Sequence, residues 1–267
     1  MWSKAGSILV EPDGQSTDLP DPTFPPMLSG HGLDVGVELF GEACRRAATG
    51  EAGAGDVFWG RRTDRLQCAV VLEPEVSADH SLQMVYAAML AFGDAFGAVA
   101  PPEIGMFYRW PATFLVNDAV VGMLQVALPE LDAADVVPDW LVVAVDIAIM
   151  PDPLADDPGS NPDSTTLHDE GCAEVTRTGL VESFCRHFLV WINEWSDEGF
   201  EPLHRHWLQR ARDHNEETTL DHMGKTHCGI FVGLDEDGNL LLRDGGGAVV
   251  SLSLFGAVGG RATGGDA

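Results

Sequence analysis

Residues 106–124, MFYRWPATFLVNDAVVGML, are the segment on which the fold prediction rests. The first five have the apolar and aromatic character of a strand, which ends at Pro111 because proline lacks a backbone N–H. The runs Phe114–Val116 and Val120–Ala127 follow, and Asn117-Asp118 between them are residues that a tight turn accepts. The segment therefore predicts a strand followed by a β-hairpin.

On both sides of this hairpin the chain alternates short buried strands with helical patterns, and its C-terminal part carries only short strands and turns. This order predicts a mixed α/β domain followed by a small antiparallel β unit. The predicted strands are Val57–Trp59, Cys68–Leu72, Trp140–Met150, Gly229–Gly233, Leu240–Arg243 and Ala248–Leu252, and the predicted helices are 34–49, Ser81–Ala98, Leu180–Trp195 and Phe200–Glu216.

The length of 267 residues suits one large domain with a small one, and the 45% hydrophobic content suffices for a sizeable core. The pattern predicts an irregular leader at 1–25, a main domain at 26–223 and a small β domain at 224–267. The Pro/Asp/Gly/Ser-rich stretch Pro151–Ser164 is predicted to be a surface loop.

The formal net charge is −27, with 42 acidic and 15 basic residues, and only Lys4 and Lys225 among the basic residues are lysines. Such a surface repels phosphate backbones and anionic lipid headgroups, which argues against nucleic acid or membrane partners. Two interpretations of the acidity remain, solubility and a specific cationic partner.

Five scattered cysteines without a CxxC pair indicate reduced thiols rather than a disulfide framework. The N-terminal residues lack the pattern of a signal peptide, and no stretch reaches the length of about 18 apolar residues that a membrane span needs. We therefore expect a cytoplasmic protein, and the sequence leaves its oligomeric state open.

Four segments, in this order, resemble motifs of the biotin and lipoate protein ligases. Phe58–Arg65 resembles the Gly/Arg loop of biotin ligases, and Arg109–Thr113 with the hairpin Phe114–Leu124 resembles their KWPND motif and the hairpin after it. Leu141–Ile149, followed by 164–167, is similar to the family's "viGiGiNv" strand with its downstream "tSL". Gly229–Leu242 is similar to the "GiD..G.LLl" signature that opens their C-terminal barrel.

Lys225-Thr226-His227 and Gly233–Glu236 further resemble the KTH and GLDE segments of the biotin/lipoate A/B protein ligase family. The resemblance spans roughly residues 34–258. It implies a mixed sheet flanked by helices, as in class II aminoacyl-tRNA synthetases and biotin ligases, with a small SH3-like C-terminal β-barrel.

The resemblance also implies ATP-dependent activation of a small carboxylic acid (biotin, lipoate or octanoate) as an acyl-adenylate, with Mg²⁺. The acyl group would pass to a lysine of a biotinyl or lipoyl carrier domain. A carboxylate and a phosphate must then meet, so preorganised cations are needed. Arg61, Arg62, Arg65 and Arg109 are the candidates, because guanidinium groups suit bidentate anion contacts. The loop arginines also fit a solvated turn paired with acids.

Four more residues are candidates for the site. The resemblance implies that Trp110 and Gly122 shape the pocket. Asp146 is a lone acid in a buried strand, either a carboxylate near the ligand or a satisfied structural residue. Lys225 is the one lysine that would approach the site, from the domain junction, and it also fits an exposed linker position.

Several positions depart from the family's motifs. Arg109 replaces the KWPND lysine, and Ala112 and Thr113 replace its Asn and Asp. Val120 falls near the second family lysine and Ala148 at the family's asparagine. Each lost charged group lowers catalytic rates by roughly 10²–10³. The sequence thus supports two functions, a ligase with altered motifs and a non-catalytic module that binds an acyl or nucleotide ligand.

The histidines at 204, 206, 214, 222 and 227 match no zinc signature, since HRH at i and i+2 on a helix points its rings to different faces. Asp235–Gly238 resembles the start of a calcium loop but lacks the remaining ligands, which favours a hairpin turn. We therefore predict no resident metal site.

Overall fold

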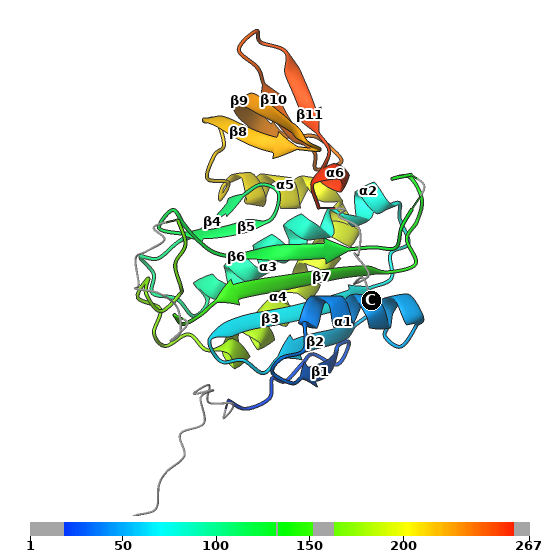
Figure 1. Cartoon of the computed structure of the whole chain (residues 1–267), viewed down its shortest axis with the longest axis vertical. Helices are drawn as coiled ribbons and strands as arrows, with labels where there is room; N and C mark the ends of the chain where they lie inside the picture. The colour runs from blue at the N-terminus through cyan, green and yellow to red at the C-terminus, as the bar shows by residue number, and fades with distance from the viewer. Residues whose placement is uncertain (1–18, 132, 152–162, 259–267) are drawn as a thin grey trace, which may run out of the picture.

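The computed structural model describes residues 19–131, 133–151 and 163–258. Two sheets organise this part of the chain (Figure 1), one of seven strands in the order β1-β2-β3-β7-β6-β5-β4 and one of four in the order β11-β10-β9-β8. The strands of the first are β1 (Ser29–Leu33), β2 (Asp56–Gly60), β3 (Arg65–Leu72), β4 (Met106–Arg109), β5 (Thr113–Val116), β6 (Ala119–Ala127) and β7 (Leu141–Ala148).

The seven-stranded sheet is mixed, since β1 and β2 run parallel and all other neighbouring pairs run antiparallel. The predicted hairpin is present as β5 and β6, with Asn117 and Asp118 both at positive φ in its turn. The predicted mixed α/β class is confirmed. Strand β1 was not predicted, because SGHGL carries a single large apolar residue.

One face of this sheet packs on the helices α3 (Met84–Gly97) and α4 (Arg177–Glu198). Helix α3 is apolar all round and almost entirely buried, as the sequence predicts for a central helix. The segment predicted as Ser81–Ala98 is divided, because a short helix α2 (Ala78–Ser81) precedes α3.

Within the described ranges, the other face is covered only in part, by α1 (Leu39–Thr49), which packs on Phe58, Ala69 and Ala144 (Figure 1). Glu38 caps the start of α1 by accepting from two backbone N–H groups, and Gly50 ends it in the left-handed conformation that glycine accepts without strain. The remainder of this side, toward β6, β5 and β4, is here named the open face.

The C-terminal sheet contains β8 (Glu217–His222), β9 (Lys225–Leu234), β10 (Leu240–Arg243) and β11 (Val249–Leu252), and α6 (Leu254–Val258) follows it. A small antiparallel β unit was predicted, but β8 was not. The predicted helix Phe200–Glu216 is wrong in its second half, because α5 spans Phe200–Leu208. The strand ETTLDH alternates in exposure with few apolar residues, which conceals it in the sequence.

The two sheets are joined through Trp207 of α5, which is fully buried. Its ring stacks on Tyr108 of β4, meets Tyr86 of α3 edge-on and contacts Phe231 of β9. The Tyr86 hydroxyl donates to the carbonyl of Gly238 in the β9–β10 turn. A single aromatic cluster therefore holds α3, β4 and the C-terminal sheet together. Among the described helices, none combines the length and the apolar run that crossing a bilayer requires.

We expect Trp207→Ala to lower the free energy of unfolding by about 3–5 kcal/mol, because it leaves a cavity that α3 and β9 cannot both fill. The measurement is urea denaturation followed by circular dichroism. Val190→Ala is the control, since Val190 on α4 is 61% exposed, and we expect a change within about 0.5 kcal/mol. Equal effects of the two substitutions would contradict the assigned role of Trp207.

Candidate functional site on the open face

Residues from five strands form one row across the open face. Directly opposed residues of antiparallel strands point to the same side of a sheet. The pairing register aligns Arg109 with Thr113, Thr113 with Met123, Met123 with Asp146, and Asp146 with Gln67. Met123 in the middle of the row is 51% exposed, which is consistent with an uncovered surface.

A polar cluster lies at the β3 end of this row. Arg65 donates from Nε at 2.8 Å and from Nη2 at 2.6 Å to Oδ1 of Asp146, and Gln67 donates from Nε2 at 3.0 Å to Oδ2. Arg65 and Gln67 reach the same carboxylate because residues two apart on a strand share a face. The Asp146 side chain is 21% exposed and that of Arg65 is 39% exposed. Both oxygens of Asp146 are therefore engaged.

The neighbours of this cluster are small. Gly60 at the end of β2 has no room to spare, since a Cβ there would lie 3.3 Å from Oε1 of Gln67. Ala148 lies opposite Arg65 in the strand pairing. The polar heads of Arg65 and Gln67 thus stand above small residues on a partly covered surface, which is an arrangement that a small ligand can reach.

The loop after β2 carries Arg61 and Arg62, two more of the four predicted arginines, and each is paired with an acid. Arg61 donates at 2.7 Å to Asp21 and its guanidinium lies 4.7 Å from the Trp59 ring centroid. The hydrogen bond raises the pKa of Arg61 and lowers that of Asp21. Arg62 donates to Asp64. The positive charges of both loop arginines are therefore balanced by nearby aspartates.

Arg177, at the start of α4, was not singled out in the sequence. It is 1% exposed, and its guanidinium lies 4.9 Å from the Trp59 centroid. Nη1 donates at 3.3 Å to the carbonyl of Gly60, whereas Nε has no partner in the described part of the chain. Burial and the charge of Arg61 lower the pKa of Arg177. This residue supports the arginine loop from the helix side.

The remaining predicted site residues make no side-chain hydrogen bond to the cluster. Arg109 ion-pairs with Asp213 at 3.2 Å. Trp110 is buried and donates at 3.2 Å to the Tyr86 hydroxyl, so its indole belongs to the core between α3 and the C-terminal sheet. Gly122 lies opposite Ile147, and a Cβ there would collide with the Asp146 carbonyl oxygen. It therefore admits only glycine.

Lys225 is exposed at the start of β9, where it lies opposite His222 across the β8–β9 turn. Its side chain makes no hydrogen bond or ion pair with any residue that the structure describes. The structure thus brings Arg65 and Asp146 together, adds Gln67, and does not join Lys225 or Arg109 to them.

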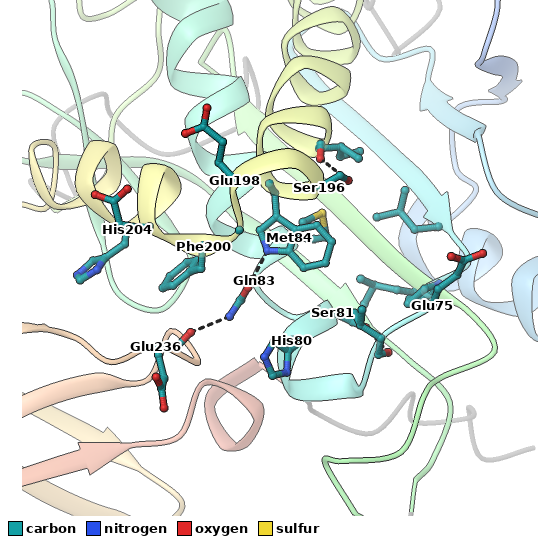
Figure 2. A pocket seen from close by; sticks show the side chains of 18 of the residues that line it. Glu75, His80, Ser81, Gln83, Met84, Ser196, Glu198, Phe200, His204 and Glu236 are labelled. Carbon is teal, nitrogen blue, oxygen red and sulfur yellow. Dashed lines mark hydrogen bonds between the residues drawn. The ribbon is translucent and has the colours of Figure 1, made fainter.

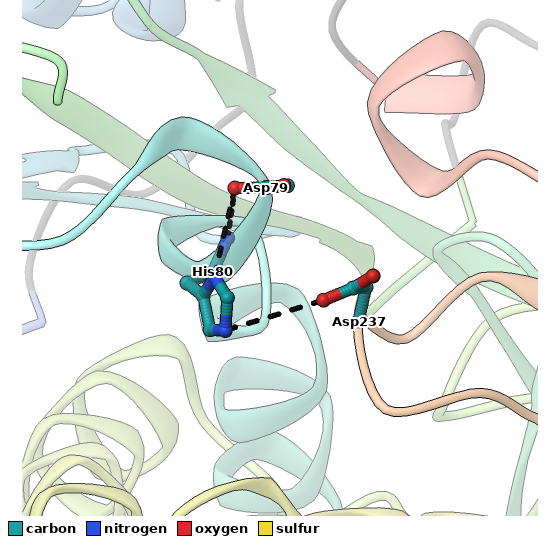
Figure 3. Close-up of side chains that lie close together, drawn as sticks. All are labelled: Asp79, His80 and Asp237. Carbon is teal, nitrogen blue, oxygen red and sulfur yellow. Dashed lines mark hydrogen bonds and ion pairs between the residues drawn. The ribbon is translucent and has the colours of Figure 1, made fainter. Parts of the chain in front are cut away.

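One group has the composition of a cation site. Asp79, His80 and Asp237 place one potential ligand atom each within 4.8 Å of one another (Figure 3). Asp79 lies 3.6 Å from Nδ1 of the imidazole, and Asp237 lies 4.0 Å from Nε2. The two carboxylates thus approach opposite ring nitrogens, a geometry in which they hold the histidine rather than share a central ion. The group links α2 to the β9–β10 turn.

Comparison with known proteins places this geometry in a family context. The profile of the biotin/lipoate A/B protein ligase family matches residues 24–209. A curated relative, the biotin--[acetyl-CoA-carboxylase] ligase of Paracoccus denitrificans, is 30% identical over 186 residues, which are 68% of this chain and 75% of that protein.

Two solved structures share the fold. A biotin protein ligase-like protein of unknown function from Silicibacter sp. TM1040 is 37% identical with a TM-score of 0.80, over 90% of this chain and all of that one. The biotin protein ligase of Aquifex aeolicus in complex with biotin and ATP is 17% identical with a TM-score of 0.67, over 84% and 95% of the two chains. The match of residues 24–209, together with the Paracoccus relative, shows that this chain belongs to the biotin/lipoate A/B protein ligase family.

Proposed function

We propose that the open face binds a small carboxylic acid with a polar headgroup, and that this family member holds its ligand without converting it to an adenylate. The observation that carries the proposal is the Arg65–Asp146–Gln67 cluster, a fixed set of hydrogen-bonding groups on a partly covered surface. The coarser statement, a protein built like a biotin or lipoate ligase, rests on the family assignment.

Adenylation needs cations that are free to meet two anions at once. Each of the four predicted arginines is already opposed by a carboxylate, in the pairs Arg61–Asp21, Arg62–Asp64, Arg65–Asp146 and Arg109–Asp213. Each pair is locally neutral, so a phosphate or carboxylate would have to displace an aspartate before it gained a cation. This arrangement opposes the chemistry of acyl-adenylate formation.

Magnesium and its nucleotide fit the cluster poorly for a related reason. Mg²⁺ binds through carboxylates together with the phosphates of its nucleotide. Oδ1 of Asp146 already accepts two hydrogen bonds and Oδ2 accepts one, so a metal ion would have to compete with Arg65 and Gln67 for this carboxylate.

The cluster also bears on which acid is bound. Biotin carries a ureido group with N–H donors and a carbonyl acceptor, lipoate carries a dithiolane and octanoate an alkyl end. Buried or half-buried polar groups discriminate against ligands that leave them unpaired, often by more than a missing apolar contact does. The hydrogen bonds to Asp146 leave Nη1 of Arg65 and Oε1 of Gln67 available, so a ligand with both acceptors and donors, such as biotin, is favoured among the three acids.

A second candidate function is an active biotin ligase, which would also act on a carrier-domain lysine. It is favoured by the identity of 30% to a curated biotin--[acetyl-CoA-carboxylase] ligase. The arginine side chains at 34–41% exposure retain access to solvent and to an incoming anion.

We expect biotin to raise the melting temperature more than lipoate or octanoate at equal concentration. At a ligand concentration of about 100 times Kd, binding adds about 2.7 kcal/mol of stability, and each kcal/mol corresponds to about 2–4 °C for a chain of this size. Gln67→Leu and Arg65→Leu should abolish the shift. Arg205→Gln, which alters an exposed pair on α5, should leave it intact. Equal shifts for all three acids would contradict the assignment of the cluster.

We expect no acyl-adenylate when the protein is incubated with ATP, Mg²⁺ and each of the three acids, because the arginines are neutralised. Mass spectrometry of the small-molecule fraction is the measurement, and the Arg109→Ala variant should give the same spectrum as the unaltered protein. An adenylate that Arg109→Ala abolishes would establish the second candidate instead, a ligase whose site is rebuilt around arginine.

A further inference from the structure

A cavity lies between helices α3 and α4 and the β9–β10 turn (Figure 2). Its volume is about 980 Å³, and its walls come from the segment between β3 and α3, the junction of α4 and α5, and the β9–β10 turn. Leu72 in its wall is at the opposite end of β3 from Arg65. The two residues are seven positions apart along the strand, a distance of about 23 Å. Because seven is odd, their side chains point to opposite faces of the sheet. The cavity is therefore separate from the polar cluster.

Apolar side chains form much of its wall, including Met84, Ile192, Trp195, Phe200 and Leu234. Trp195 is fixed in place because its Nε1 donates at 2.7 Å to Oε1 of Gln83. The amide of Gln83 in turn donates at 2.9 Å to the backbone carbonyl of Glu236 in the β9–β10 turn. The aromatic wall is thus held rigidly between the main domain and the C-terminal sheet.

The charges around this cavity are all of one sign. Its lining contains no lysine or arginine. It contains six carboxylate side chains, those of Glu73, Glu75, Glu198, Glu201, Asp235 and Glu236. Glu201 pairs with Arg205, and Asp235 accepts from Asn239 in its own turn and from Ser251 of β11. The side chains of the other four make no hydrogen bond or ion pair with any described residue. Figure 2 places Glu75, Glu198 and Glu236 on three different sides.

The four unpaired glutamates are solvent-exposed residues in the lining of a largely apolar cavity, and like charges gathered there repel one another and attract a cation. His204 adds a polar atom without a partner, since its Nε2 is buried and unbonded among the described residues while its ring stacks on Phe200. Burial lowers the pKa of this histidine, which favours its neutral form.

From this geometry we propose that the cavity between α3, α4 and the β9–β10 turn is a second ligand site, which takes an organic ammonium compound with an apolar body. The apolar part lies against Trp195 and Phe200, whose ring faces also attract cations. The ammonium faces the unpaired glutamates. The volume lies within the range of small-molecule sites, which favours a small ligand over a folded partner.

Binding at this cavity does not depend on binding at the open face, because the two sites share no residue. At this cavity, the acidic side chains have a role beyond solubility. Since the walls come from both the main domain and the C-terminal sheet, a bound ammonium also reinforces their contact.

The experiment is calorimetric titration of the full chain with three probes that share one body: 4-phenylbutylamine, 4-phenylbutanol and 4-phenylbutyrate. We expect the amine to bind, the alcohol to bind more weakly and the anion not to bind. Affinity for the amine should fall as NaCl rises, because salt screens exposed charges. Spermidine tests whether charge alone suffices, and we expect it to bind more weakly than the amine.

Variants separate this site from non-specific attraction to an acidic protein. Glu75→Gln combined with Glu198→Gln should weaken the amine about fivefold or more. Glu103→Gln combined with Glu130→Gln, two acids outside the cavity lining, should leave its affinity unchanged. Phe200→Leu should weaken the amine and the alcohol together. Absence of amine binding, equal binding of all three probes, or equal losses in both double variants would overturn the proposal. Binding of a basic peptide but not of the amine would also overturn it and indicate a protein partner.

Discussion

The arrangement of the whole molecule depends on the need to enclose α3. This helix presents apolar side chains in every direction, so no side of it can face water without losing the free energy of burial. The sheet covers one side, α4 a second, and α5 with the aromatic cluster around Trp207 a third. Because these helices pack around α3, α1 is the one helix among the described elements that packs on the opposite side of the sheet. The open face is thus a consequence of how the core is built.

The two surfaces with chemical interest follow from the same arrangement. At the open face, Arg65 and Gln67 alternate with core residues along β3, and the strand register brings Asp146 of β7 beside them. At the far end of β3, Gln83 is hydrogen-bonded to Trp195 of α4 and to the β9–β10 turn, and the cavity lies between these elements. One surface combines both signs of charge in tight pairs, whereas the other carries negative charge alone.

Local sequence signals gave much of the fold. The hairpin turn at Asn117-Asp118 and the buried strands were predictable because their patterns are local. Strands β1 and β8 were not, since their pairing with β2 and β9 compensates for a weak apolar pattern. At the site, the arginines were identified through the family resemblance and Asp146 as a lone acid in a buried strand, but their partners were not identified. Asp146 lies 81 residues from Arg65 and Asp213 lies 104 residues from Arg109, so only the fold reveals these pairs.

The paired arginines also constrain how this site can change during evolution. Replacing Asp146 alone would leave the half-buried guanidinium of Arg65 without its counter-ion, and replacing Arg65 alone would strand a carboxylate that is only 21% exposed. Either single step is destabilising, whereas a joint change preserves local neutrality. Substitutions at these two positions should therefore be strongly epistatic, and related chains should change the two residues together or keep both.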